Sequence, residues 1–294
     1  MTLFGWIITV TFLIVLFTLT AVGLFRADII GKKKKDASKA VSCDALTFQN
    51  VGNRQYQQDS LYISDTGNRQ LLAEKGVLAV VADGMGGLQD GAEISRLVTD
   101  TFERRFREDR IRNPLSFLKQ CVTDAEKAAD DYLLSKSVKG GSTVVAALIN
   151  GSGLYYVSVG DSSIFIVRGN EVRRVNSRHN YASVLQAQVK RGLITQAEAD
   201  THPMRLRITS FIGMGEAAET DCSDKPERLA DGDVIIVCSD GVSDALGDNA
   251  LAEVVSDGDF DQLGQRMEQR ILDQNIKNQD NFSAVIVRIK GANQ

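Results

Sequence analysis

The stretch that decides the fold is GVLAVVADGMGG, residues 76–87. Six of the seven residues before Asp83 are apolar, which is typical of a buried strand. Three glycines occupy the next four positions, so we expect the strand to end at Asp83 and to continue as a glycine-rich loop. A turn would explain this pattern. A site where a carboxylate and the backbone together approach a small cation would explain it as well.

Other aspartates stand in similar places along the chain. They are Asp59 before SLYI, Asp161 after YYVSVG, Asp240 after VIIVCS and Asp280 before NFSAVIVRI. One aspartate at a strand end is usually a turn residue. Several of them converge on one rim if the strands lie side by side, and such carboxylates repel one another unless they lose charge or gain a cation. Mg²⁺ and Mn²⁺ prefer oxygen ligands of this kind, and glycine at position 84 would let its carbonyl reach a metal.

The remaining patterns favour an α+β domain. Apolar runs rich in Val, Ile and Tyr predict strands at 46–52, 60–64, 77–83, 142–150, 153–161, 163–169, 233–240 and 282–289. Helical periodicity predicts helices at 91–107, 114–135, 181–191 and 260–273. The Asn150-Gly151 pair and the sequence RGNEV predict hairpin turns. Hairpin-linked strands with helices grouped between them indicate antiparallel sheets with helices packed outside.

Composition excludes several classes of protein. The chain has 294 residues, of which 43% are hydrophobic, enough for one large domain or two small ones. A net charge of -4 argues against nucleic-acid binding. The four cysteines form no C-x-x-C motif, and with only two histidines a zinc or histidine-rich site is not expected.

The N-terminal segment predicts a membrane anchor. Residues 3–25 carry no charge and would span about 34 Å as a helix. Arg26 and Lys32–Lys35 follow the apolar run, which places that side in the cytoplasm. A cleaved signal peptide is the alternative, but it would carry positive charge before a shorter run. We expect a single-pass anchor with its flank at 1–26, a basic and polar linker at 27–42 and one domain at 43–290, facing the cytoplasm.

The order of the motifs R-x-x-x-x-D, D-G-x-G-G, G-D-S, S-D-G and D-N carries a resemblance. It is similar to the bacterial type of the metal-dependent serine/threonine protein phosphatases, the type 2C or PPM family, over about residues 47–289. The resemblance implies a four-layer α-β-β-α sandwich of two antiparallel sheets flanked by helices. It also implies two Mn²⁺ or Mg²⁺ ions at one edge, with a third, weaker ion.

The resemblance assigns a role to each matching residue. Asp83 would bridge two metals and the Gly84 carbonyl would bind one of them. Asp240 and Asp280 would bind the other metal, and Asp59 would hold metal-bound waters. The third ion would lie at two further ligands, Asp161 and Asp244. Arg54, five residues before Asp59, would grip the substrate phosphate.

Four positions depart from the family pattern. The usual glutamate is Gln58, an uncharged residue that would weaken one metal site. The usual asparagine is Gln57 and the usual arginine after G-D-S is Ser163. Met85 stands where many animal relatives have a histidine proposed as general acid, so water would protonate the leaving oxygen.

These residues predict a membrane-anchored phosphatase that hydrolyses phosphoserine and phosphothreonine in proteins through a metal-activated bridging water. Its targets would lie near the bilayer, such as a kinase or a membrane complex. Because Gln58 and Ser163 differ from the family, a catalytically weak or inactive scaffold that binds phosphoproteins is the alternative. Serines in GGSTVV and CSDG, Ser142 and Ser239, are interpreted as backbone caps rather than nucleophiles. The two histidines, His179 and His202, fit either hydrogen-bonding roles or contacts to substrate or metal.

Overall fold

The computed structural model describes residues 41–86, 90–215 and 218–292. The predicted anchor and most of the linker lie outside these residues. Within these described ranges, no helix has both the length and the hydropathy of a membrane span. The described part of the chain forms one compact unit.

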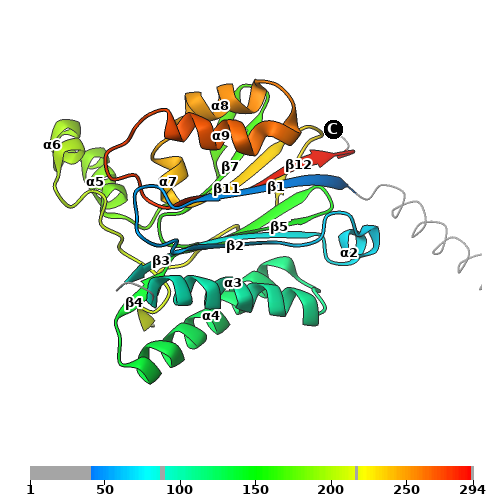
Figure 1. Ribbon diagram of the computed structural model, residues 1–294, viewed down its shortest axis with the longest axis horizontal. Coiled ribbons are helices and arrows are strands. Elements are labelled where there is room, and N and C mark those ends of the chain that lie inside the picture. The colour runs from blue at the N-terminus through cyan, green and yellow to red at the C-terminus, as the bar shows by residue number, and fades with distance from the viewer. Residues whose placement is uncertain (1–40, 87–89, 216–217, 293–294) are drawn as a thin grey trace, which may run out of the picture. The chain divides into compact units, whose positions relative to one another are not determined.

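Two antiparallel sheets make up the centre of this unit (Figure 1). The first sheet has the order β1 (Ser42–Asn50), β12 (Phe282–Lys290), β11 (Val234–Cys238), β7 (Ser163–Arg168) and β8 (Glu171–Arg174). The second has the order β10 (Glu227–Arg228), β6 (Gly153–Val159), β5 (Val144–Asn150), β3 (Val77–Gly86) and β2 (Asp59–Ile63). Two short strands extend the second sheet, β4 (Gly140–Ser142) on β3 and β9 (Asp221–Cys222) on β6.

Helices cover the outer face of each sheet (Figure 1). The second sheet packs against α3 (Asp90–Glu108) and α4 (Pro114–Lys136). The first sheet is covered by α8 (Asp248–Ser256) and α9 (Leu263–Leu272), the latter preceded by η2 (Phe260–Gln262). Shorter helices are α2 (Arg69–Glu74), α5 (Tyr181–Lys190), α6 (Gln196–Thr201) and α7 (Asp240–Ser243). The predicted α+β sandwich of two sheets between helices is therefore confirmed.

The alternation of side chains along β3 explains why its sequence is apolar throughout. Leu78 and Val80 point toward the helices and pack with Phe102 of α3. Val77 and Val81 point the other way, into the layer between the two sheets. Successive residues of a strand face opposite sides, so a strand buried on both faces has no polar position until its end. Burying each of these side chains contributes about 1.5–3 kcal/mol.

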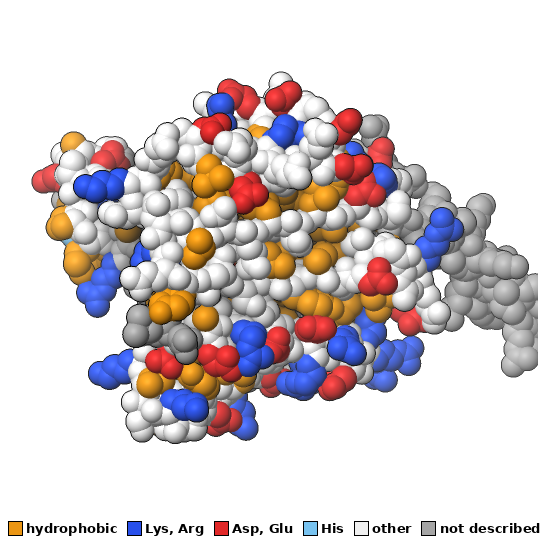
Figure 2. All heavy atoms as spheres, viewed as in Figure 1, with side chains coloured by type: hydrophobic (Ala, Val, Ile, Leu, Met, Phe, Trp, Pro, Cys, Tyr) orange, Lys and Arg blue, Asp and Glu red, His pale blue; other side chains and the backbone are white. Residues whose placement is uncertain are grey.

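Local signals set the turns and helix ends where they were predicted. Asn150 pairs with Gly153 across the predicted hairpin, and Gly151 takes a φ of 58°. Asn113 begins α4 by accepting a hydrogen bond from the Ser116 amide at 2.9 Å. The four predicted helices are all present, the last as η2 followed by α9. Figure 2 shows acidic and basic side chains interspersed over the two outer helical layers.

The prediction that the strand ends at Asp83 is wrong. The extended conformation of β3 continues to Gly86, where Gly84 pairs with Ser142 and Gly86 with Gly140 of β4. The short strand β4 supplies hydrogen-bond partners for backbone groups that a loop would leave to solvent. The glycine-rich stretch is therefore part of the sheet up to Gly86.

Candidate active site

The fold gathers the predicted aspartates at one edge of the sandwich. Asp59 of β2 and Asp83 of β3 are direct partners in the register of neighbouring strands. Asp240 is the first residue of α7, just after β11, and Asp280 lies just before β12. Because β11 and β12 are antiparallel neighbours, the end of one strand lies beside the start of the other. Residues separated by up to 221 positions in sequence (59 to 280) thus come to one rim.

Two buried serines hold the carboxylate-bearing residues in place. Ser239 donates from Oγ to Asp59 Oδ2 at 2.8 Å and accepts from the Ser283 amide at 3.0 Å, which ties the two sheets together. Ser142 donates from Oγ to the Asp83 carbonyl at 3.1 Å. Both serines are fully buried, so they have no access to substrate. Ser142 bonds to backbone carbonyls, as predicted for a capping hydroxyl, whereas Ser239 makes no side-chain capping bond to α7 and instead bonds to Asp59 and to the Ser283 amide.

Gly84 is required by packing. A Cβ at this position would lie 2.0 Å from the carbonyl oxygen of Gly91 at the start of α3, and 2.8 Å from that of Gln58. Contacts this short are prohibited between non-bonded atoms, so no other residue fits without moving α3. The structure therefore gives a reason for the glycine that the sequence analysis did not find.

Burial and mutual repulsion raise the pKa of the clustered carboxyl groups. Burial is the first cause in each case; it raises the pKa of Asp59 to about 7, of Asp161 to about 7 and of Asp240 to about 6. The pKa of Asp83 lies well above its ordinary value, through burial and then through the charges of Asp59, Asp240, Asp280 and Asp161. Such shifts indicate carboxyl groups that either keep a proton or gain a positive partner near neutral pH.

The donor atoms of the cluster fit a divalent cation. Asp59 Oδ1, Asp161 Oδ1 and Asp240 Oδ1 are buried and have no hydrogen-bond partner among the described residues. Hard cations such as Mg²⁺ and Mn²⁺ take such carboxylate oxygens as ligands. Across the ranges that the structure describes, no three His, Cys, Asp or Glu side chains yet converge on one point as a complete ligand set.

Arg54 lies at the mouth of the cluster. Its side chain is 54% exposed and donates to Asp280 Oδ2 at 2.6 Å. The loop that carries it is held by Asn281, whose side chain accepts from the Gln58 amide at 2.8 Å and donates to the Val51 carbonyl at 2.8 Å. The sequence analysis included Asn281 in the D-N motif but assigned it no role.

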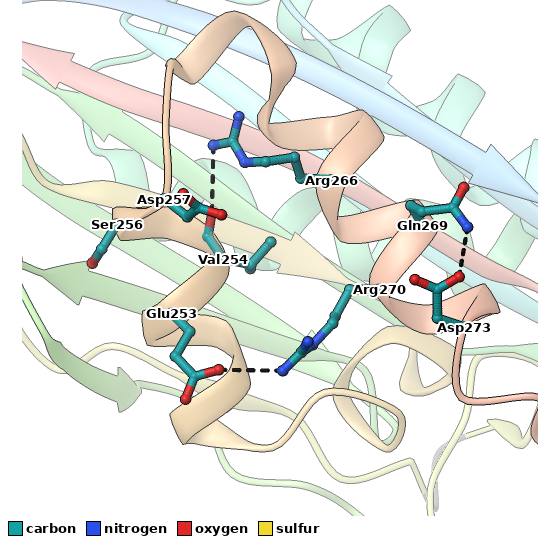
Figure 3. Close-up of a pocket in the computed structure, with 8 residues that line it drawn as sticks. All are labelled: Glu253, Val254, Ser256, Asp257, Arg266, Gln269, Arg270 and Asp273. Carbon is teal, nitrogen blue, oxygen red and sulfur yellow. Dashed lines mark hydrogen bonds and ion pairs between the residues drawn. The ribbon is translucent and has the colours of Figure 1, made fainter.

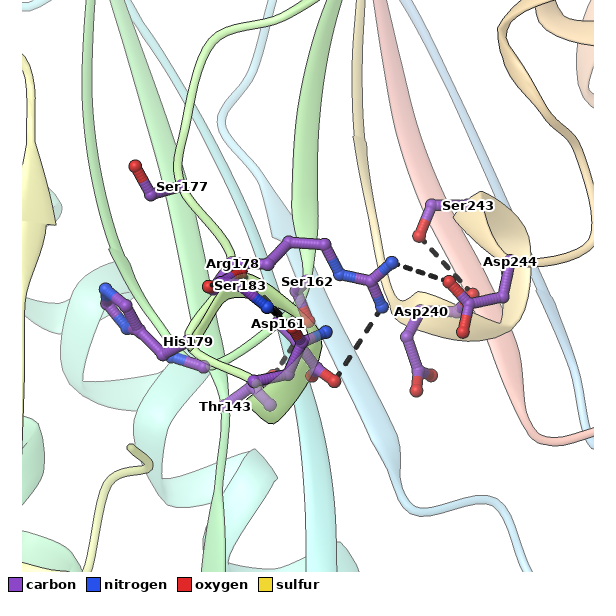
Figure 4. A network of polar contacts seen from close by, with 12 residues as sticks. Thr143, Asp161, Ser162, Ser177, Arg178, His179, Ser183, Asp240, Ser243 and Asp244 are labelled. Atoms are coloured by element: carbon purple, nitrogen blue, oxygen red, sulfur yellow. Dashed lines mark hydrogen bonds and ion pairs between the residues drawn. The ribbon is translucent and has the colours of Figure 1, made fainter. Parts of the chain in front are cut away.

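A second arginine, Arg178, was also missed. It lies between β8 and α5 and points its guanidinium toward Asp161 and Asp244 (Figure 4). The single turn of α7 brings Asp244 onto the same side as Asp240, four residues earlier. Nothing in the surrounding sequence, RHNYAS, distinguishes Arg178 as a site residue.

The four residues that depart from the family pattern differ in their hydrogen bonding and burial. Gln57 accepts through Oε1 from the Asp59 amide at 3.1 Å. Gln58 and Ser163 are different, because Gln58 Nε2 and Ser163 Oγ are buried without a partner among the described residues. Met85 lines an apolar groove of about 490 Å³ together with Phe211 and others beside β4.

Both histidines make structural contacts. His179 is buried and accepts through Nδ1 from the Gly160 amide at 3.1 Å, which fixes the residue before Asp161. Burial lowers the pKa of His179. His202 packs on the Tyr181 ring with 5.2 Å between centroids. These contacts favour the hydrogen-bonding and packing roles over the alternatives.

A separate groove between α8 and α9 has a volume of about 560 Å³ (Figure 3). Polar groups that line it bond to one another: Arg270 lies 3.2 Å from Glu253, and the Gln269 amide donates to Asp273 at 2.6 Å. None of the clustered aspartates lines it. The aspartate rim is therefore the candidate active site.

A family model described as Protein phosphatase 2C matches residues 49–281. The chain belongs to the protein phosphatase 2C family. A protein phosphatase 2C-type protein of Streptococcus pyogenes is 30% identical over 200 residues, covering 66% of this chain and 79% of that protein. The solved serine/threonine phosphatase of S. agalactiae has a TM-score of 0.73 at 25% identity, covering 84% of this chain and 99% of that one.

A third similarity extends the structural comparison. The catalytic domain of the serine/threonine phosphatase PstP, solved with two manganese ions, has a TM-score of 0.68 at 22% identity. The match covers 85% of this chain and 99% of the PstP chain, and at this identity the comparison supports the fold alone. As a protein phosphatase 2C, the chain is a metal-dependent phosphoprotein phosphatase, a hydrolase, and the predicted enzyme class is confirmed. The roles of the individual aspartates stay predictions.

Proposed function

We propose that the protein is a membrane-anchored serine/threonine protein phosphatase that uses two Mn²⁺ or Mg²⁺ ions at the rim of Asp59, Asp83, Asp240 and Asp280. The observation that carries the proposal is the gathering of these carboxylates at one rim, with buried, unpartnered oxygens on Asp59 and Asp240. Unpaired buried carboxylates are costly, so their presence together favours a cation-binding role. The proposed number of ions equals that in the PstP structure, which was solved with two manganese ions.

The protein's own residues would position the substrate and shape the site. Arg54 is exposed beside Asp280, so its guanidinium can turn to a phosphate and hold two of its oxygens. Asp83 and the Gly84 carbonyl would hold one ion, and Asp240 with Asp280 the other, while Ser239 keeps Asp59 oriented to accept from water.

Phosphate-monoester hydrolysis needs a barrier reduction on the order of 20 kcal/mol or more. The bound ions would supply much of it by lowering the pKa of a bridging water and by neutralising charge on the phosphoryl oxygens. The thioether of Met85 cannot donate a proton to the departing serine or threonine oxygen, so solvent water would do so.

Metal-dependent turnover tests this proposal. The full-length protein in detergent should hydrolyse a phosphothreonine peptide with Mn²⁺ and lose this activity in EDTA. Asp240→Asn should abolish turnover, whereas Asp224→Asn, which removes the same charge from an exposed position, should leave it unchanged. Absence of Mn²⁺-dependent turnover in the wild type would refute the enzymatic proposal and favour the scaffold.

We also propose that residues 3–25 anchor the enzyme in the membrane with the phosphatase domain in the cytoplasm. The support is the uncharged apolar stretch and the lysines that follow it. Targets near the bilayer, including a kinase or a membrane complex, follow from that location. In membranes from producing cells, the protein should resist alkaline carbonate extraction, and protease added to the outside of intact cells should spare the domain. Release by carbonate would contradict the anchor.

A further inference from the structure

Arg178 occupies the position that the family resemblance gives to a third ion. Its Nη1 donates to Asp244 Oδ1 at 2.6 Å, and its Nη2 lies 3.7 Å from Asp161 Oδ2 (Figure 4). The side chains of Arg178 and Asp161 are 14% and 3% exposed, so this pair is interior, whereas the Asp244 side chain on the other side of the guanidinium is 39% exposed. Interior pairs are weakly screened by salt and hold their geometry.

The backbone around Arg178 is fixed on both sides. Its carbonyl accepts from Ser183 Oγ at 2.7 Å, in the first turn of α5. The next residue, His179, donates its amide to the Gly160 carbonyl at 2.8 Å and accepts from the Gly160 amide at 3.1 Å. Gly160 directly precedes Asp161, so the segment that carries the arginine is tied to the segment that carries its carboxylate partner.

A divalent ion does not fit between Asp161 and Asp244 while the guanidinium is there. Mg²⁺ would need carboxylate oxygens at about 2.0–2.1 Å, and the Arg178 nitrogen already lies 2.6 Å from Asp244 Oδ1. The two cations would also repel each other at this separation. Arginine stays charged at any pH at which the protein is folded, so the site cannot be vacated by deprotonation.

We propose that Arg178 replaces the third divalent ion, so that this phosphatase binds two exchangeable ions and carries a permanent third cation of its own. This inference rests on the proposed function, because it assumes the pair of ions at Asp83 and Asp240. It replaces the expectation of a third, weaker ion at Asp161 and Asp244. The cation next to the reaction centre would then not depend on the metal concentration.

Counting bound Mn²⁺ tests the inference without measuring activity. Free Mn²⁺ gives a sharp electron paramagnetic resonance signal, so titration of the full-length protein in detergent yields the number of ions bound. We expect two ions for the wild type and three for Arg178→Ala. The control Arg173→Ala removes the same charge from an exposed pair with Glu227 and should still bind two.

Further variants locate the additional ion. Arg178→Ala combined with Asp244→Asn should return to two ions, and Arg178→Lys should bind two because the cation is kept. The wild-type count needs no variant to fold, so the inference stays testable if Arg178→Ala is unstable.

Three ions in the wild type, or two in a folded Arg178→Ala, would overturn the inference and leave the proposed function intact. A wild type that binds no Mn²⁺ would refute both.

Discussion

Replacing Asp240 with asparagine should stabilise the protein in the absence of divalent ions while abolishing its activity. Asp240 is largely covered within the carboxylate cluster, with intermediate exposure, and its pKa is raised from 3.8 to about 6 by desolvation and then by the charges of Asp244 and Asp280. The folded protein therefore keeps this proton to higher pH than the unfolded chain does. The resulting stabilisation is complete below pH about 4 and is lost as the pH rises through about 6.

The shift of about two pKa units corresponds to about 3 kcal/mol at pH 8. Asp240 also lies in the first turn of α7, where a negative charge gains up to about 1 kcal/mol from the helix dipole. An uncharged asparagine removes both terms, so the expected net gain in the free energy of unfolding is about 2 kcal/mol. For a domain of this size that raises the melting temperature by about 4–8 °C.

Circular dichroism melts of the full-length protein in detergent and EDTA measure this effect. The gain should be present at pH 8 and fall to about zero at about pH 3, where Asp240 is protonated in both the folded and the unfolded protein. Added Mn²⁺ should raise the melting temperature of the wild type more than that of the variant. The exposed change Asp224→Asn is the matched control and should have no effect. If the melting temperature of Asp240→Asn at pH 8 in EDTA equals or lies below that of the wild type, repulsion between the carboxylates does not destabilise the folded protein.

Three further predictions follow from single contacts. Ser239→Ala removes a hydrogen bond that lowers the pKa of Asp59, so this pKa should rise. The Mn²⁺ concentration for half-maximal activity at pH 7 should therefore increase about tenfold. An unchanged concentration would contradict this role of Ser239. Glu126→Gln weakens the hydrogen bond that the carboxylate accepts from the Gly213 amide at 3.1 Å. Hydrogen exchange of that amide should therefore be about tenfold faster in the variant than in the wild type. Equal exchange rates in the two proteins would contradict this prediction. Arg54→Lys replaces a planar guanidinium, which can bind phosphate through two N–H groups, with a single ammonium group. The kcat/KM for a phosphopeptide should therefore fall about 100-fold. Full activity would show that Arg54 does not bind the substrate phosphate in this way.

Much of the fold followed from local signals. Three signals predicted their elements correctly: the apolar run of β3, the Asn150-Gly151 turn and the helical periodicity of α4. Each depends on hydrogen bonds and side-chain contacts between residues that are close in sequence, so it can be recognised in a short segment. Short elements such as α8 were not predicted, because nine residues offer few apolar repeats and the helix depends on packing against the first sheet.

The sequence by itself singled out the candidate site residues, since aspartates at the ends of apolar strands are visible without coordinates, and their individual roles stay predictions. The tertiary structure alone decided how they meet: Asp59 faces Asp83, and Ser239 reaches Asp59 from the other sheet. It alone also placed Arg178 between two carboxylates and made Gly84 necessary for the approach of α3. The physical reason is that strand register and interlayer contacts join residues far apart in the chain, and no local periodicity encodes such pairings.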